Sequence, residues 1–203
     1  MRRALLLLPL AFLLTGCKAE SPEEMAAADP TSTAGIPEQP LPGPVTTPAV
    51  SPESAGIAYD LPEGWNRVAP ASTMRIDQAT IPGPGGSAEM GVFFFGAGSG
   101  GDVRANLDRW ASQVESDAPP VEETFETAGL RVTWMDVSGT LEPSTMGMGP
   151  STPQPNSRMF AAVVEGEGGP WFFKVTGPEE TMAAERDAFV AMLRSVRKPT
   201  EAS

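Results

Sequence analysis

The chain carries few of the side chains that usually perform catalysis. Its 203 residues include no histidine and one cysteine, Cys17, close to the N-terminus. Ser–His–Asp and Cys–His nucleophiles and histidine-based zinc sites are therefore excluded. What remains is carboxylate, lysine or serine chemistry, the single tyrosine Tyr59, and the thioethers of methionine.

A glycine-rich segment has the spacing of a nucleotide-binding loop. Gly96, Gly98 and Gly101 follow G-x-G-x-x-G between an expected strand and an expected helix. A dinucleotide site needs a parallel βαβ unit, whereas the pattern that follows here is a hairpin. Asp102 would also place a negative charge where the pyrophosphate sits, at the helix N-terminus. The segment is therefore interpreted as a flexible turn, and no cofactor is predicted.

The titratable groups give no clear catalytic pair. Lys174 lies in an apolar strand, where burial would lower the pKa of its amine, but strand alternation favours an exposed lysine or one paired with a glutamate. The acidic pairs Glu122–Glu123, Glu165/Glu167 and Glu179–Glu180 fall at strand ends, a turn and a helix start. Each of these places has an ordinary structural use for acids, so paired catalytic carboxylates remain a third-ranked hypothesis.

The methionines raise the possibility of a soft-metal site. Met146 and Met148, with Met159 beyond them, offer thioether sulfurs that suit Cu(I). Two methionines in a loop rich in proline and glycine are more often plain loop residues. No metal ligand is predicted, and a small-ligand or copper carrier that uses this loop is kept as the alternative function.

The N-terminus has the pattern of an export signal. Arg2 and Arg3 precede an apolar run, residues 4–14, that is too short to span a bilayer. The run ends in Leu-Thr-Gly-Cys17, which resembles the bacterial lipobox. This resemblance implies cleavage before Cys17, a diacylglyceryl group on its sulfur and acylation, such as palmitate, on its freed amine. An ordinary secretory signal with an incidental cysteine stays as the alternative.

Composition divides the rest of the chain. We expect residues 1–16 to be a signal peptide and 17–55 to be the lipidated Cys17 followed by a disordered tether, because this stretch is rich in proline and poor in large apolar residues. Residues 56–197 form one globular domain, and 198–203 are a tail. The formal net charge of −12 opposes nucleic-acid binding, since such a chain repels phosphates.

Within the domain, hydrophobic periodicity predicts seven strands and two helices. The strands cover residues 57–61, 74–81, 88–95, 121–127, 130–141, 158–165 and 171–176; the helices cover about 103–116 and 178–197, and residues 142–157 form a long mobile loop. Hairpins dominate this order. The expected fold is α+β, with a mainly antiparallel sheet of about six or seven strands and two packed helices.

Two details of the helices support this assignment. The first has Asp102 as a plausible N-cap and a stripe of Val103, Leu107, Trp110 and Val114, while the second buries Met182, Phe189, Met192, Leu193 and Val196. The four tryptophans should mostly fill the core, and an exposed one beside the 142–157 loop would mark a binding patch.

Several segments together resemble PsbP-like domains, which are α/β/α sandwiches. They are Tyr59-Asp-Leu-Pro-Glu-Gly-Trp65, the central helix, the hairpin ending in Trp171-Phe-Phe-Lys-Val-Thr176 and the final helix through Val196. The pattern Gly100-Gly101…Asn106…Arg109-Trp110 is similar to that of uncharacterised bacterial lipoproteins. The resemblance implies a binding or assembly module.

These observations predict a membrane-anchored lipoprotein of the bacterial envelope that acts as a non-catalytic binding or assembly module. Its expected partners are the membrane, through lipid on Cys17, and an envelope protein. Lys18 follows the cysteine in place of an aspartate, which points to the periplasmic face of the outer membrane in a Gram-negative cell.

Overall fold

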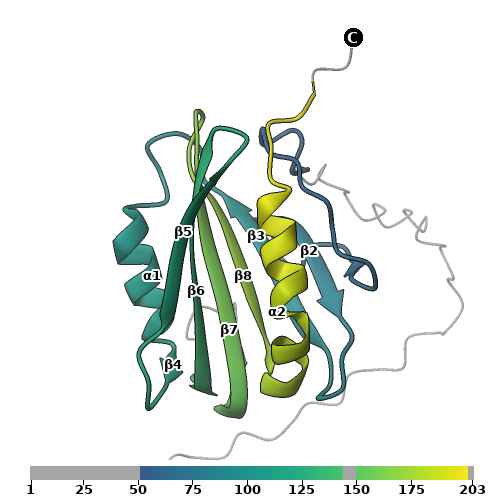
Figure 1. Cartoon of the computed structure of the whole chain (residues 1–203), viewed down its shortest axis with the longest axis vertical. Coiled ribbons are helices and arrows are strands. Elements are labelled where there is room, and N and C mark those ends of the chain that lie inside the picture. Colours follow the sequence, from purple (N-terminus) through teal and green to yellow (C-terminus); the bar gives the residue numbers. More distant parts are fainter. Residues whose placement is uncertain (1–50, 144–149, 201–203) are drawn as a thin grey trace, which may run out of the picture. The chain divides into compact units, whose positions relative to one another are not determined.

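The computed structural model describes residues 51–143 and 150–200 (Figure 1). In chain order the elements are β1 (Asn66–Arg67), β2 (Arg75–Ile81), β3 (Ala88–Phe94), α1 (Val103–Ala111), β4 (Val114–Glu115), β5 (Val121–Thr127), β6 (Leu130–Leu141), β7 (Gln154–Glu165), β8 (Trp171–Pro178) and α2 (Glu179–Arg194). None of the helices in these ranges is long and apolar enough to cross a membrane.

The eight strands form one antiparallel sheet. Their order is β1-β2-β3-β8-β7-β6-β4, and β5 pairs with the first half of β6. The α+β class with two helices is therefore confirmed. The strands differ from the predicted set in two respects. Residues 57–61 form only a single bridge, from Ala58 to Arg197, and the two-residue strands β1 and β4 extend the sheet at its two sides.

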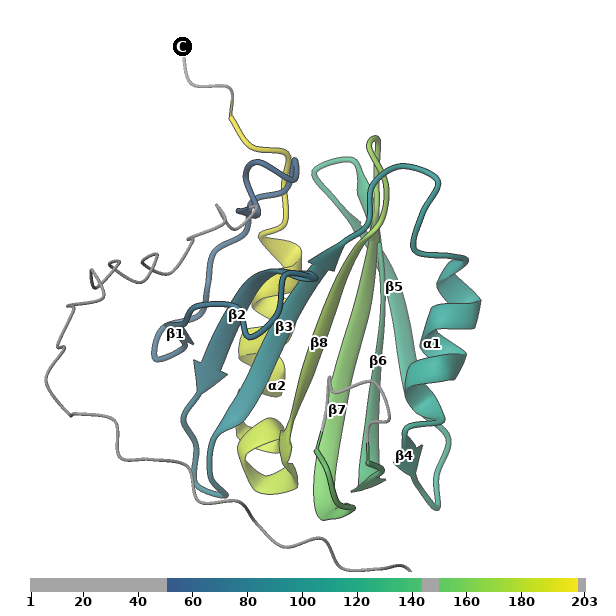
Figure 2. The ribbon, with the colours of Figure 1, turned by 180° about the vertical axis from the view of Figure 1, so that it is seen from behind.

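The two helices cover opposite faces of this sheet, and each face has its own core. In β7, Phe160, Ala162 and Val164 point toward the core under α2, whereas the alternate residues Met159, Ala161 and Val163 point toward the core under α1. Helix α2 lies in front of the strands in Figure 1 and behind them in Figure 2. A sheet buried on both faces explains why these strands are almost continuously apolar.

Helix α1 is shorter than the apolar stripe predicts. It ends at Ala111, and Val114 belongs to β4, where it pairs with Leu141 and still fills the core under α1. Val114 thus reaches the core under α1 from a strand and not from a further turn of the helix. The N-cap is confirmed, since the Asp102 carboxylate accepts a hydrogen bond from the Ala105 amide at 3.1 Å.

Helix α2 has Pro178 at its N-cap and ends at Arg194, three residues before the predicted end. All five predicted residues are buried, four within the helix and Val196 just after its C-cap, Ser195. The predicted loop 142–157 is too long at its C-terminal end, because β7 already begins at Gln154, which pairs with Leu141. The domain also begins earlier than predicted. Ala55, assigned to the tether from sequence, is buried, and its carbonyl oxygen accepts a hydrogen bond from the Trp171 indole at 2.9 Å.

The sheet ends in short or acidic strands. Strand β1 has two residues, as has β4. Strand β5 pairs on one side only, with β6, and its exposed residues include Glu122, Glu123 and Glu126. Long apolar strand edges are therefore not presented by the described residues.

Candidate functional site

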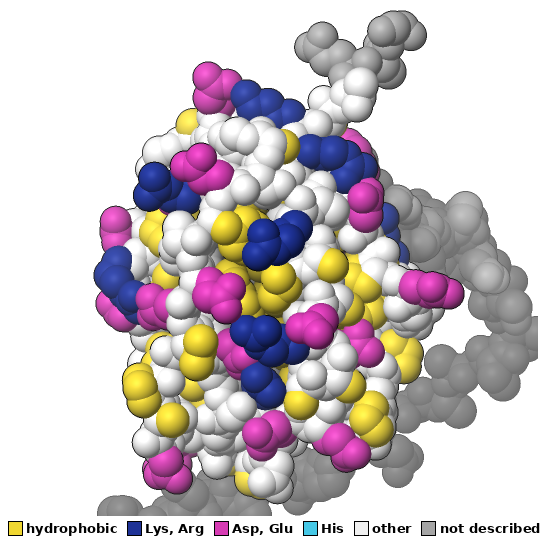
Figure 3. Space-filling model, in the orientation of Figure 1, with side chains coloured by type: hydrophobic (Ala, Val, Ile, Leu, Met, Phe, Trp, Pro, Cys, Tyr) yellow, Lys and Arg dark blue, Asp and Glu magenta, His cyan; other side chains and the backbone are white. Residues whose placement is uncertain are grey.

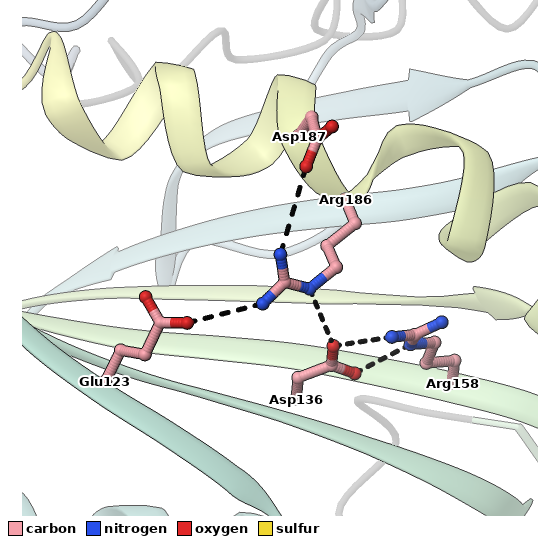
Figure 4. Close-up of polar contacts among 5 residues, drawn as sticks. All are labelled: Glu123, Asp136, Arg158, Arg186 and Asp187. Carbon is pink, nitrogen blue, oxygen red and sulfur yellow. Dashed lines mark hydrogen bonds and ion pairs between the residues drawn. The ribbon is translucent and has the colours of Figure 1, made fainter.

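A buried ion-pair network lies between the sheet and α2 (Figure 4). Arg158 of β7 donates two parallel hydrogen bonds to Asp136 of β6, from Nε to Oδ1 at 2.7 Å and from Nη2 to Oδ2 at 2.6 Å. Arg186 of α2 donates from Nε to the same Oδ2 at 3.3 Å. Asp136 is only 6% exposed, and its buried charge is compensated by these two arginines.

The network extends outward from Arg186. Its guanidinium reaches Glu123 of β5 at 3.4 Å and Asp187 at 3.8 Å, and lies 5.1 Å from the centre of the Trp134 ring. Hydrogen bonding to Asp136 raises the pKa of Arg158, and the charges of Asp136 and Glu179 add to this effect. These charge-assisted hydrogen bonds join β6, β7 and α2, so the network fixes α2 on the sheet.

An open hollow of about 540 Å³ lies at the end of the sheet where α2 begins. Its wall includes Glu115 and Asp117 from the segment after α1, Ser138 of β6, Asn156 of β7 and Glu179 of α2. Ser138 pairs with Arg158 in the sheet, so the hollow adjoins the ion-pair network. Figure 3 shows the α2 side of the molecule, where basic side chains lie over apolar surface near the centre of the view. The hollow itself is polar and has three acids around it.

Three acids do not make a metal site here. In residues 51–143 and 150–200 there is no group of three acidic, histidine or cysteine side chains placed to hold a metal ion. Met146 and Met148 lie outside the described residues. Met159 is fully buried in the core under α1, where its sulfur packs among apolar side chains.

Lys174 is placed differently from the prediction that strand alternation favoured. It is neither fully exposed nor paired with a glutamate. Its side chain is partly buried on the α1 side of the sheet, and its amine donates a hydrogen bond to Gln113 Oε1 at 2.5 Å. Burial, followed by the nearby charges of Arg109 and Arg75, lowers the pKa of this amine to about 8. The apolar neighbours that suggested a buried strand therefore gave the better indication.

The other predicted candidates have structural roles. Tyr59 is buried and donates a hydrogen bond to Asp77, which also accepts one from Arg67 Nε at 2.8 Å. Burial, and then Asp77, raises the pKa of the Tyr59 hydroxyl far above its ordinary value. All four tryptophans are buried, so none forms an exposed patch.

The acidic pairs lie apart from one another. Glu122 contacts Arg104 at 2.6 Å, Glu123 contacts Arg186, and Glu167 contacts Lys198 at 2.7 Å. Of the three pairs, only the one at the start of α2 contributes to the hollow, through Glu179.

The glycine-rich segment is a connection. Gly96, Gly98, Gly100 and Gly101 all have positive φ angles, which glycine adopts readily. Asn106 of α1 donates from its amide to the Gly100 carbonyl at 2.7 Å and the Asp102 carbonyl at 2.9 Å. Since β3 and its neighbours pair antiparallel, the parallel βαβ unit of a dinucleotide site is missing from the described part of the chain.

Sequence reasoning missed the Asp136 network. Asp136 follows Val132 and Trp134 on the same face of β6, so alternation would have placed its charge in the α2 core. A buried acid requires a cation, and the register of β7 was needed to show that Arg158 supplies it.

The fold thus defines a class, an α+β domain in which one antiparallel sheet lies between two helices. No family model and no curated protein sequence matches the chain. Among solved structures, the domain is similar to protein PA94 of Pseudomonas aeruginosa, a protein of unknown function. The two are 13% identical, the match covers 61% of this chain and 83% of that one, and the TM-score is 0.44.

Proposed function

We propose that this protein is a lipoprotein of the bacterial envelope, anchored through Cys17, whose α+β domain is a non-catalytic, PsbP-like binding module. The observation that carries the binding role is the open polar hollow beside Asp136. The hollow sits on a framework that two arginines fix in place, which is how a preformed binding surface is built.

The hollow indicates the chemistry of a partner. Glu115, Asp117 and Glu179 give it an acidic border, and Ser138 and Asn156 add hydrogen-bonding groups. The whole chain is acidic as well, with a formal net charge of −12. A partner that presents basic side chains would be attracted to this surface and oriented by it.

The anchoring part rests on the sequence pattern that ends in Cys17. Replacing Cys17 with alanine and fractionating cells tests it, because lipidation is the source of stable membrane attachment. We expect the variant to leave the membrane fraction. If it stays as membrane-bound as the parent, the anchor assignment is wrong.

The binding part needs a test at the hollow. A photo-crosslinking residue at Asp117 should give a discrete product in the native envelope, and the same residue at Glu126, which is exposed outside the hollow, should not. The product should weaken when Glu115 and Glu179 are both replaced by glutamine. Equal products from both positions, or none from Asp117, would contradict a partner at the hollow.

A further inference from the structure

We propose that the α1 side of the sheet holds an anion-binding site, made by Lys174 of β8, Arg109 of α1 and Arg75 of β2, that takes the carboxylate or phosphate group of a small ligand. None of these three residues lines the hollow, and the site does not depend on the function proposed above.

The strands bring two of the cations together. Lys174 pairs with Gly91 of β3, and Gly91 pairs with Gln78 of β2. Because Gly91 has no side chain, the Phe93 ring and Arg75 share the space above it, where a Cβ atom would lie 3.2 Å from the ring and 3.4 Å from Arg75 Nε. Arg75 therefore lies over β3, with its guanidinium 5.8 Å from the centre of the Phe93 ring, and its side chain is only 9% exposed.

The C-terminal end of α1 supplies the other wall. Gln113, just after the helix, accepts the hydrogen bond from Lys174, and Arg109 lies one turn earlier. Arg109 is exposed and close enough to lower the pKa of the Lys174 amine, as is Arg75. The cluster thus has a buried side at Arg75 and Lys174 and a solvent side at Arg109, by which an ion can enter.

The cluster has more positive charge and more donors than its own residues satisfy. Among the residues that the structure describes, Glu89 of β3 is the one carboxylate that forms an ion pair with these cations, and it accepts hydrogen bonds from Arg75 Nη1 at 2.7 Å and Gln78 Nε2 at 3.0 Å. Lys174 and Arg109 donate to the neutral amides of Gln113 and Asn106, and neither forms an ion pair with any residue the structure describes.

Arg75 Nε adds an unmet donor. This atom is buried and has no hydrogen-bond partner within residues 51–143 and 150–200. Three cations with one carboxylate stand out in a chain with 26 acidic and 14 basic residues. Charges that repel one another while partly buried are stabilised by an anion, and guanidinium and ammonium groups are the usual ligands of carboxylate and phosphate.

The amine of Lys174 reports on occupancy. Its pKa is lowered by burial and by the two guanidiniums, so a bound anion must raise it. The chain has three lysines, Lys18, Lys174 and Lys198, which makes their NMR signals assignable by substitution. Lys198, exposed and paired with Glu167, is the matched control.

The test uses the full chain, purified in detergent with isotope-labelled lysine, and two probes, inorganic phosphate and acetate. We expect saturable binding of at least one probe near neutral pH. The bound probe should shift the Lys174 signal and move the midpoint of the Lys174 pH titration to a higher pH, while the Lys198 signal stays unchanged. Phosphate and acetate arms show which group the site prefers.

Two variants assign the binding to these side chains. Lys174→Met should abolish it, and Arg109→Gln, at an exposed position, should weaken it about tenfold or more without affecting folding. Lys198→Met should bind as the parent does. The proposal is overturned if neither probe binds, if Lys198 responds as strongly as Lys174, or if folded Arg109→Gln protein binds both probes with unchanged affinity.

Discussion

The buried amine of Lys174 should make the protein less stable than it would be with an apolar side chain. In the folded protein the pKa of this amine is about 8, against an ordinary value of 10.5. Because one pKa unit corresponds to about 1.4 kcal/mol, the charged amine costs the folded state about 3 kcal/mol near neutral pH. Lys174→Met removes this cost but leaves Gln113 without its partner, a loss of about 1 kcal/mol. The variant should therefore be about 2 kcal/mol more stable near pH 7.

The sign of the pH dependence follows from the two pKa values. Below about pH 8 both the folded and unfolded parent are charged at Lys174, so the full cost is present. Between about pH 8 and pH 10.5 the folded chain loses its proton first, and the parent gains stability as the pH rises. The advantage of Lys174→Met should thus fall from about 2 kcal/mol near pH 7 to about zero near pH 10.

Urea unfolding of both proteins at the two pH values measures this difference, in buffers without phosphate or carboxylate. Groups that titrate equally in both proteins, such as Tyr59, cancel in the comparison. Lys198→Met should differ from the parent by no more than about 0.5 kcal/mol at either pH, as exposed substitutions do. A constant difference across pH, or a variant that is less stable near pH 7, would refute the argument that Lys174 is buried beside two cations.

Three further substitutions test the framework. Asp136→Asn leaves two arginines without their buried carboxylate and should lower the free energy of unfolding by about 3–5 kcal/mol. The control Asp187→Asn, at an exposed position, should have almost no effect. Similar values for both variants would disprove the buried network. Tyr59→Phe removes the hydroxyl donor of buried Asp77 and should cost about 1.5–3 kcal/mol in urea unfolding, and an unchanged midpoint would contradict that bond. Gly139→Ala places a Cβ atom 2.1 Å from the Glu115 carbonyl oxygen, which forces β4 away from β6. The amides between these two strands should therefore lose protection in hydrogen exchange, and retained protection would contradict the close approach.

The sequence pattern predicted the main elements well where one periodicity dominated. The C-terminal segment from Met182 to Val196 has a single apolar face, and all five predicted positions are buried. The hairpin of β5 and β6 has the predicted bounds, because Ala128-Gly129 marks its turn. Local patterns of this kind need no knowledge of the rest of the fold.

Errors arose where the next contact was distant in sequence. Val114 fits the helical stripe of α1, yet its backbone pairs with Leu141 in β6. Gln154 follows a proline-rich stretch, yet it belongs to β7 because β6 continues far enough to pair with it. The spacing of apolar residues along the chain cannot show how a strand pairs with one that is distant in sequence. The predicted end of α1 and the predicted start of β7 were wrong for this reason.

The site residues show the same limit. Lys174 was recognised as unusual, but whether its amine was buried depended on α1, Gly91 and Arg75, which lie far away in the sequence. The partners of Asp136 also come from β7 and α2. Types of side chain can be read from a sequence, whereas the charges that surround them require the sheet order.

The edges of the sheet restrict how this domain can meet another protein. An added strand would find on one side the two residues of β1, which cover only Ala79 and Thr80 of β2, and on the other side the short strand β4 and the glutamates of β5. None of these edges favours long continuous pairing. Backbone-to-backbone recognition, the mode that extends a sheet across two molecules, is therefore disfavoured. Copies of the domain can be crowded together without joining edge to edge, and specific contacts are left to the side chains on its two covered faces.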